Sequence, residues 1–139
     1  MIHLRNLQDA DRIKEQVNRG VRQVVLLGGG FISLELAENF VRLGISTTVV
    51  ERNDQILTPF DKEMTTPVVE ALLGKGVTLL LGQSAEALEQ TANGLVVCLN
   101  SGQRLPTHLG IFGIGVRPDN PRAGGAHPAN GERADVRLN

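Results

Sequence analysis

Three consecutive glycines and one downstream glutamate have the residue types and spacing of a site for a phosphorylated nucleoside. Gly28, Gly29 and Gly30 follow the apolar run 24–27, and Glu51 comes about 20 residues later, near the usual offset of a ribose-binding acid. Gly28 permits a tight turn, and Gly30 lacks a Cβ, so the backbone can approach a pyrophosphate closely. Free N–H groups at the start of a following helix would face the phosphates. The carboxylate of Glu51 would accept hydrogen bonds from ribose hydroxyls, so the pattern predicts a site for the ADP half of a dinucleotide.

Neighbouring residues refine this prediction. Ser33 stands where the G-x-G-x-x-G pattern has its third glycine, a position that governs helix–strand packing. Because serine is only slightly larger than the alanine often accepted there, we expect a slightly wider gap and a retained site. Glu51 would repel a 2′-phosphate, which favours NAD(H) over NADP(H), although Arg52 directly after it weakens that preference. FAD is an alternative ligand, because FAD-binding domains use the same turn and ribose carboxylate.

The elements that must position these residues are visible in the pattern of apolar residues. The helical period predicts helices over residues 7–18, 30–43 and about 61–74. Apolar runs predict parallel strands over residues 24–27, 46–50 and 77–81. Asn6 is the expected N-cap of the first helix and Asp61 that of the third. Pro67 would either delay the start of the third helix or bend its first turn.

The pattern changes after the third strand. Three short segments are separated by the turn signals TANG and NSG and predict a three-stranded antiparallel meander over residues 86–90, 95–99 and 103–106. Residues 107–114 then predict a returning strand of the parallel sheet. The expected fold class is α/β, a Rossmann-like three-layer βαβ nucleotide-binding domain with a parallel sheet plus an antiparallel β-meander. We expect residues 1–20 to hold its N-terminal helix, residues 21–118 to form the NAD(H)-binding domain, and residues 119–139 to be a disordered tail or truncated linker.

Composition limits the partners. The chain has 139 residues, 41% of them hydrophobic, and a net charge of −1, which suits one domain and excludes nucleic acid or an anionic membrane as expected partners. The single cysteine, Cys98, rules out an internal disulfide and favours a reducing, cytoplasmic compartment. We expect Cys98 to be structural, with no adjacent base or partner thiol. The three histidines, His3, His108 and His127, have no metal-ligand spacing, so no metal site is expected.

Several segments together resemble one enzyme family. GGGFISLELAE, VVERNDQILTPFDKEM and GIGVRP, with LRNLQDADRIKE upstream, are similar to the NAD-binding domain of the pyridine nucleotide–disulfide oxidoreductase family. The likeness covers about residues 3–118 and is closest to the coenzyme A-disulfide reductase and NADH oxidase branch. The family implies an FAD-dependent enzyme that passes hydride from NADH to FAD and then electrons to a disulfide or peroxide.

The resemblance adds roles to particular residues. Phe31 matches the aromatic residue that covers the flavin, and Glu35 matches the helix glutamate near the nicotinamide carboxamide. Gly113 and Gly115 match the glycines that pass the nicotinamide end of the cofactor. His108 departs from the family, which commonly has aspartate there, and is expected to affect stability. The expected cofactor-binding set is Gly28, Gly29, Gly30, Phe31, Ile32, Ser33, Glu35, Glu51, Arg52, Gly113 and Gly115.

The family's other parts are not in this sequence. We find no second glycine motif for the flavin, no redox cysteine and no dimerisation domain. The expected function is therefore an isolated NAD(H)-binding domain, inactive alone, with no catalytic residue of its own and with FAD in a missing domain supplied in cis or in trans. The alternatives are a non-catalytic nucleotide-binding or regulatory module, a subunit that docks on a separate flavin protein, or a truncated gene whose tail after Pro118 is not native.

Overall fold

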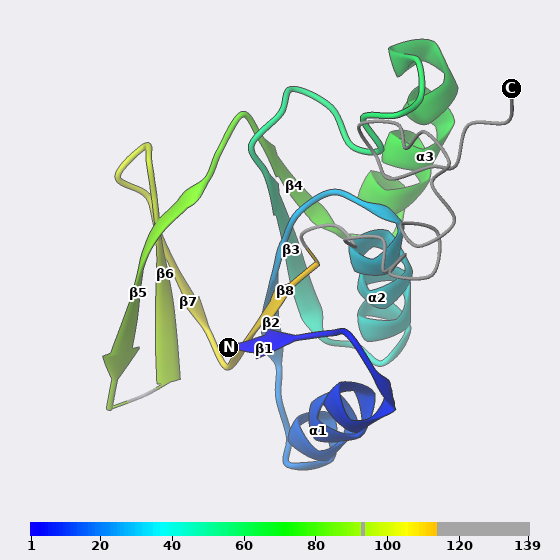
Figure 1. Ribbon diagram of the computed structural model, residues 1–139. Coiled ribbons are helices and arrows are strands. Elements are labelled where there is room, and N and C mark those ends of the chain that lie inside the picture. The colour runs from blue at the N-terminus through cyan, green and yellow to red at the C-terminus, as the bar shows by residue number, and fades with distance from the viewer. Residues whose placement is uncertain (93, 114–139) are drawn as a thin grey trace, which may run out of the picture.

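The chain folds into three layers: helices, a parallel sheet and an antiparallel meander (Figure 1). The computed structural model describes residues 1–92 and 94–113. The expectations for Gly115, the end of the returning strand and the tail 119–139 lie outside the described residues. The α/β fold class with its parallel sheet and separate meander is confirmed.

The central layer is a parallel sheet buried on both faces. Its strands are β1 (Ile2–His3), β2 (Gln23–Leu27), β3 (Ser46–Glu51), β4 (Thr78–Leu81) and β8 (Leu109–Phe112). They lie in the order β1-β8-β2-β3-β4, and every pair in this sheet is parallel. The carboxyl ends of β8, β2, β3 and β4 therefore meet at one edge, where ligands bind in open α/β sheets.

One face of the sheet is covered by helices. They are α1 (Leu7–Asn18), α2 (Phe31–Arg42) and α3 (Lys62–Gly74), and Figure 1 shows them on the side opposite the meander. The predicted cap of α1 is confirmed, since the Asp9 N–H donates to Asn6 Oδ1 at 3.0 Å. The helix α3 begins at Lys62 and contains Pro67, so the delayed start is wrong. Asp61 occupies the N-cap of α3 without a side-chain capping bond.

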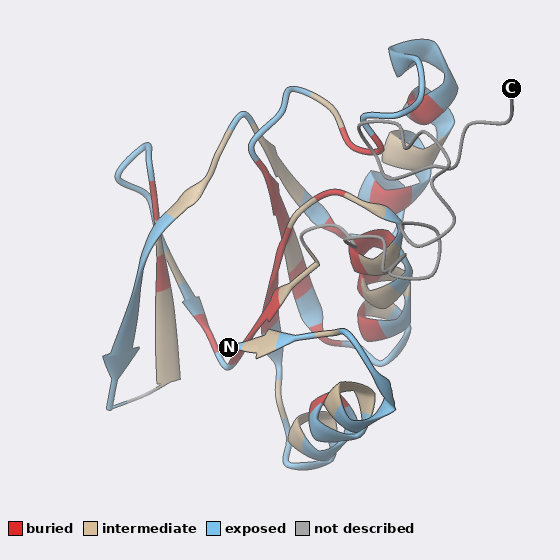
Figure 2. Cartoon of the chain, in the orientation of Figure 1, coloured by how far each residue is buried: buried red, intermediate tan, exposed pale blue. Residues whose placement is uncertain are grey.

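The other face is covered by the meander. Its strands are β5 (Ala85–Thr91), β6 (Gly94–Leu99) and β7 (Arg104–Thr107), paired antiparallel in that order. Val97 and Leu99 of β6 pack on Val25, Leu27 and Val50 of the sheet. Most of β5 is exposed, and Figure 2 shows it in pale blue.

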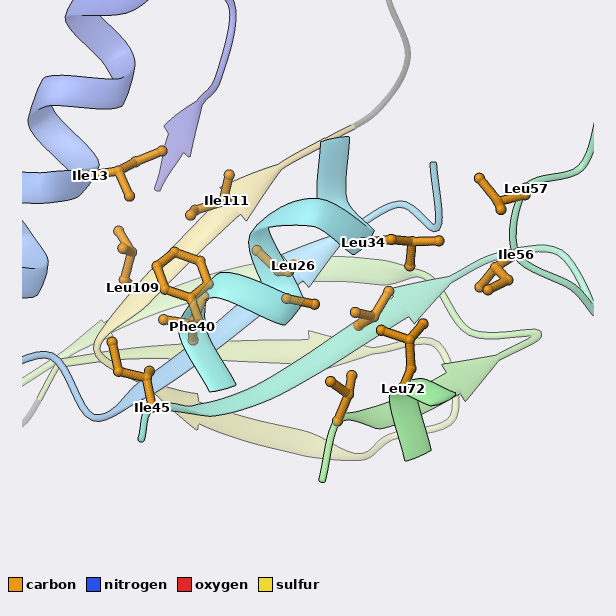
Figure 3. Close-up of a cluster of buried hydrophobic side chains, with 14 residues drawn as sticks. Ile13, Leu26, Leu34, Phe40, Ile45, Ile56, Leu57, Leu72, Leu109 and Ile111 are labelled. Carbon is orange, nitrogen blue, oxygen red and sulfur yellow. The ribbon is translucent and has the colours of Figure 1, made fainter. Parts of the chain in front are cut away.

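The larger core lies between the sheet and the helices. Figure 3 shows its side chains, among them Leu26 of β2, Ile111 of β8, Phe40 of α2 and Leu72 of α3. All four are less than 9% exposed. This core holds the start of α2 against the carboxyl ends of the strands, where the glycine turn lies.

Two details differ from the expected elements. The two-residue strand β1 was not predicted, because so short a segment carries no periodicity; it pairs with β8 through Ile2 and Ile111, and His3 stacks on Phe112 with ring centroids 4.4 Å apart. The predicted returning strand 107–114 divides at His108. Thr107 ends β7, and its hydroxyl donates to the carbonyls of Gln23 and Leu109.

Candidate functional site

A pocket of about 490 Å³ lies at the carboxyl edge of the parallel sheet. Its wall combines the glycine turn after β2, the end of β3, the loop before α3, the loop after β4 and the end of β8. Seven predicted residues line it: Gly28, Gly29, Gly30, Phe31, Glu51, Arg52 and Gly113. Segments far apart in sequence therefore meet at one place.

The glycine turn is fastened to its surroundings by backbone hydrogen bonds. Gly28 has φ +106°, a conformation that glycine adopts at little cost, and its N–H donates to the Val50 carbonyl at 2.8 Å. The Gly29 carbonyl accepts from the N–H of Leu57 at 2.9 Å. Leu57 itself has φ +51°, a strained value for a residue with a side chain, so this bond helps to hold the pocket wall in place.

Each of the next two glycines leaves space for a different neighbour. A Cβ on Gly29 would lie 3.0 Å from Ile56 Cγ2 and 3.2 Å from Glu51 Oε2, so this position must be a glycine for the glutamate to pack against the turn. Gly30 is the N-cap of α2, and a Cβ there would meet only the Gly113 carbonyl, 3.9 Å away. The start of α2 is thus open toward the pocket, as a phosphate site requires.

Glu51 is held in place by hydrogen-bond donors. Its side chain is buried, at 9% exposure, and Oε2 accepts from the Gly29 N–H at 2.6 Å. Oε1 accepts from the backbone N–H of Asn53 at 2.8 Å and from the Asn53 side-chain amide at 2.6 Å. The carboxylate that ends β3 is therefore oriented by the glycine turn on one side and by Asn53 on the other. Asn53 was missed by sequence reasoning, although its place two residues after Glu51 was a usable signal.

Ser33 lies beneath the turn and not on the pocket surface. It is fully buried, and a Cβ on Gly113 would overlap its Oγ atom. The hydroxyl at the third glycine position is accommodated because Gly113, the residue directly after β8, has no side chain. Among the described residues, Ser33 Oγ has no hydrogen-bond partner.

Phe31 and Arg52 occupy the rim of the pocket. Phe31 is 63% exposed, and its ring lies at 84° to that of Phe60, with the two ring centroids 5.8 Å apart. Arg52 is exposed beside Glu51. The rim thus offers an aromatic face near the glycine turn and a cation near the predicted ribose carboxylate.

Two predicted residues face a different hollow. Ile32 and Glu35 line a shallow groove of about 420 Å³ between α2 and residues 4–10. The structure therefore separates Glu35 from the pocket that holds Glu51.

Cys98 has polar neighbours that were not expected. Its thiol donates to Glu89 Oε1 at 3.4 Å, and Arg104 Nη1 lies 3.5 Å from the sulfur, so the expectation of no adjacent base is wrong. Burial, followed by the hydrogen bond to Glu89, raises the pKa of the Cys98 thiol. A raised pKa favours the unreactive thiol, in keeping with a structural cysteine.

Residues 1–92 and 94–113 contain neither a metal-ligand cluster nor a membrane-spanning helix. No three histidine, cysteine or acidic side chains in this part of the chain are grouped to hold a metal ion. No helix in it has the length and apolar character needed to cross a membrane.

Known proteins are similar to this chain in sequence and in fold. The family model described as pyridine nucleotide-disulphide oxidoreductase matches residues 1–136. The chain belongs to this family. The structure of reduced CoADR-RHD from Bacillus anthracis is similar, with 38% identity and a TM-score of 0.81, over 96% of this chain and 24% of that one. The water-forming NADH oxidase of Lactobacillus brevis, bound to NADH, has 25% identity and a TM-score of 0.79, over 95% of this chain and 29% of that one.

A curated relative extends the comparison to a multi-subunit enzyme. NADH-dependent phenylglyoxylate dehydrogenase subunit epsilon of Aromatoleum evansii is 31% identical over 138 residues, which are 97% of this chain and 32% of the relative. The chain spans only 26–32% of the length of the curated relatives it matches. The predicted family and branch are thus confirmed, and the chain corresponds to a part of its relatives.

Proposed function

We propose that this chain is the NAD(H)-binding domain of a flavin-dependent oxidoreductase. The observation that carries the proposal is the Glu51 carboxylate, buried at the end of β3 and hydrogen-bonded to the glycine turn. The Glu51 carboxylate and the glycine turn lie side by side. An ADP moiety requires this arrangement, because its ribose would bind the carboxylate and its pyrophosphate would bind the turn.

Strand order supports one orientation of the dinucleotide. The pyrophosphate would lie over the turn after β2 and the start of α2, and the adenosine ribose at Glu51 after β3. The base would then extend toward the loop after β4. The nicotinamide would extend the other way, past Phe31 toward Phe112 and Gly113 at the end of β8.

The negative charge of Glu51 favours NADH over NADPH as the bound cofactor. A 2′-phosphate on the adenosine ribose would lie against the buried carboxylate of Glu51, and like charges at that distance repel. Arg52 provides a positive charge beside it, so the preference is one of degree. When bound, NADH would supply a hydride, and this chain's residues would bind and orient the cofactor.

The complete enzyme contains more than this chain. In the family, hydride passes from NADH to FAD and electrons then pass to a disulfide or peroxide. The FAD domain would act in cis or in trans, and the chain alone would be inactive.

Calorimetric titration of this chain tests the binding. We expect heat on addition of NADH, and weaker binding of NADPH. Absence of NADH binding at millimolar concentration would sink the proposal. A parallel titration with FAD distinguishes an NADH site from an FAD site. Saturable binding of FAD without any binding of NADH would show that the pocket is a flavin site.

A second candidate function is that of a subunit that binds NAD(H) and docks on a separate flavin protein. The similarity to a relative named as one subunit of a dehydrogenase favours it. Cloning the neighbouring reading frames distinguishes the two. If a frame encodes a flavin domain that copurifies with this chain, the subunit is favoured; if the chain is continuous with a flavin domain, it is excluded.

A further inference from the structure

The loop after β4 is tied to the loop after β3 at the pocket. The Gly82 N–H donates to the Asn53 carbonyl at 2.8 Å, and the Gln83 N–H donates to the Glu51 carbonyl at 3.0 Å. Gln83 lines the same pocket as Glu51. Its backbone is therefore fixed beside the residue proposed to bind the adenosine ribose.

The side chain of Gln83 has an unused acceptor. Its Oε1 atom is shielded from solvent and, among the described residues, has no hydrogen-bond partner. A buried carbonyl without a donor loses its hydration and regains nothing from the protein. A change of side-chain rotamer toward the pocket, whose wall Gln83 already forms, would bring this oxygen to a donor on a ligand.

Two polar groups near Gln83 are already engaged in hydrogen bonds. The Asn53 side-chain amide donates to Glu51, and the Ser84 N–H donates to Asn100 Oδ1 at 3.0 Å. Among the described residues, the Oε1 acceptor of Gln83 therefore has no partner and is available to a ligand, and the carboxamide that carries it also has an amino group able to donate.

We propose that Gln83 recognises the base of the dinucleotide and selects adenine. The inference rests on the proposed NAD(H) function, which places the base at the loop after β4. A glutamine carboxamide matches adenine at two atoms, accepting from the 6-amino group and donating to N7. In a hypoxanthine base a 6-oxo group replaces the amino group. Either orientation of the carboxamide then leaves one acceptor of the protein facing an acceptor of the base.

Comparison of two cofactors tests this selection. The dissociation constants of NADH and of reduced nicotinamide hypoxanthine dinucleotide are measured with this chain by fluorescence titration. We expect the hypoxanthine cofactor to bind about tenfold more weakly, which is ~1.4 kcal/mol and the scale of one lost bidentate contact. Equal affinities for the two cofactors would overturn the inference.

The variant Gln83→Met keeps the length of the side chain and removes its polar atoms. We expect its NADH affinity to fall about tenfold, to the level of the hypoxanthine cofactor, so that the two bind alike. Its melting temperature should not be lower than that of the unaltered chain, because the Oε1 atom makes no hydrogen bond within the described structure. A variant that still distinguishes the two bases would also contradict the assignment.

Gln55→Met is the matched control. Gln55 lies in the loop before α3, does not line the pocket, and donates to the Phe60 carbonyl at 2.9 Å. The variant Gln55→Met should keep the tenfold ratio between the dissociation constants of the two cofactors. If the unaltered chain binds neither cofactor, the proposed function itself fails; if it binds both equally, only the role of Gln83 fails.

Discussion

Glu51 and Glu89 are both hydrogen-bonded carboxylates, and the fold places them in opposite surroundings. Glu51 is 9% exposed, and two of its donors are the backbone N–H groups of Gly29 and Asn53. Glu89 lies on the exposed strand β5 and pairs with the long side chain of Arg104. Backbone donors keep their positions without loss of side-chain freedom, whereas an exposed pair is screened by solvent. A carboxylate held by the fold is thus prepared for a ligand, and one held by a flexible partner is not.

The largest effect is expected beneath the Glu51 pocket, where packing leaves no space. Gly113→Ala should destabilise the chain by about 1–3 kcal/mol, because the new methyl group would overlap Ser33 Oγ. Urea denaturation measures the loss. Adding Ser33→Gly should restore most of it, and failure of this rescue would show that Ser33 is not the obstacle. Gly74→Ala, at a position with open space, is the control.

The next effect contrasts the two carboxylates directly. Glu51→Gln should weaken NADH binding by at least about tenfold, because an amide cannot accept from both Gly29 and Asn53 and still receive ribose hydroxyls. NADPH should lose less, since the repulsion of its phosphate is also removed. Titration of both cofactors measures the change. Glu89→Gln should leave both affinities unchanged. Equal losses of affinity in the two variants would contradict the claim that Glu51, and not Glu89, binds the cofactor.

A smaller effect is expected from the residue that orients Glu51. In Asn53→Asp, two carboxyl groups would lie at the 2.6 Å separation now occupied by an amide–carboxylate bond, and they would share a proton at low pH. NADH binding should be near normal at acidic pH and weaken roughly threefold as the pH rises and the shared proton is lost. The nearby charges are Arg52, which is exposed, and Asp54, which pairs with Lys62 at 3.4 Å.

Asn53→Ala is the comparison for that titration. It should weaken NADH binding by a similar factor at every pH, because it removes the amide and adds no titrating group. The affinity is measured by fluorescence over a series of buffers. If Asn53→Asp showed no dependence on pH, the amide would not act through Glu51.

The smallest effect concerns the exposed carboxylate. The hydrogen bond from Arg104 lowers the pKa of Glu89, so any stability from this pair is present above the unfolded pKa and is lost as the pH falls through the lower folded pKa.

Glu89→Gln removes a contact that raises the pKa of Cys98, so alkylation of the thiol should begin at a lower pH. The rate of iodoacetamide labelling against pH measures this. An unchanged profile would mean that Glu89 does not contribute to the raised pKa of Cys98.

Much of the fold could be predicted because its elements carry local signals. The expected helix over residues 7–18 matches α1, and the expected helix over 30–43 matches α2 to within a residue at each end. The meander could be predicted because two turn signals separate its three strands. The strand β1 could not be predicted, because its two residues form a strand only by pairing with β8, more than 100 positions along the chain.

The site was predictable in part. The glycine turn and Glu51 belong to one continuous motif, so their meeting is a consequence of a single βαβ unit. Asn53 and Gln83 belong to loops after two different strands, and their roles depend on side-chain orientation. Their positions after strands of a parallel sheet were a usable signal, since such strand ends meet at one edge. Nothing in the sequence shows that the Asn53 amide pairs with Glu51 while Gln83 Oε1 has no hydrogen-bond partner among the described residues.

The sequence by itself determined the strand–turn–helix–strand unit, the family and the acidic residue at the end of β3. These follow from periodicity, from glycine's conformational freedom and from spacing, all of which act over short stretches of chain. Only the tertiary structure decided that Glu35 faces a different groove from Glu51, that Ser33 fits because Gly113 has no side chain, and that Gln83 Oε1 has no hydrogen-bond partner within the described part of the chain. Those facts depend on the directions of side chains from separate elements, which are set when the layers pack.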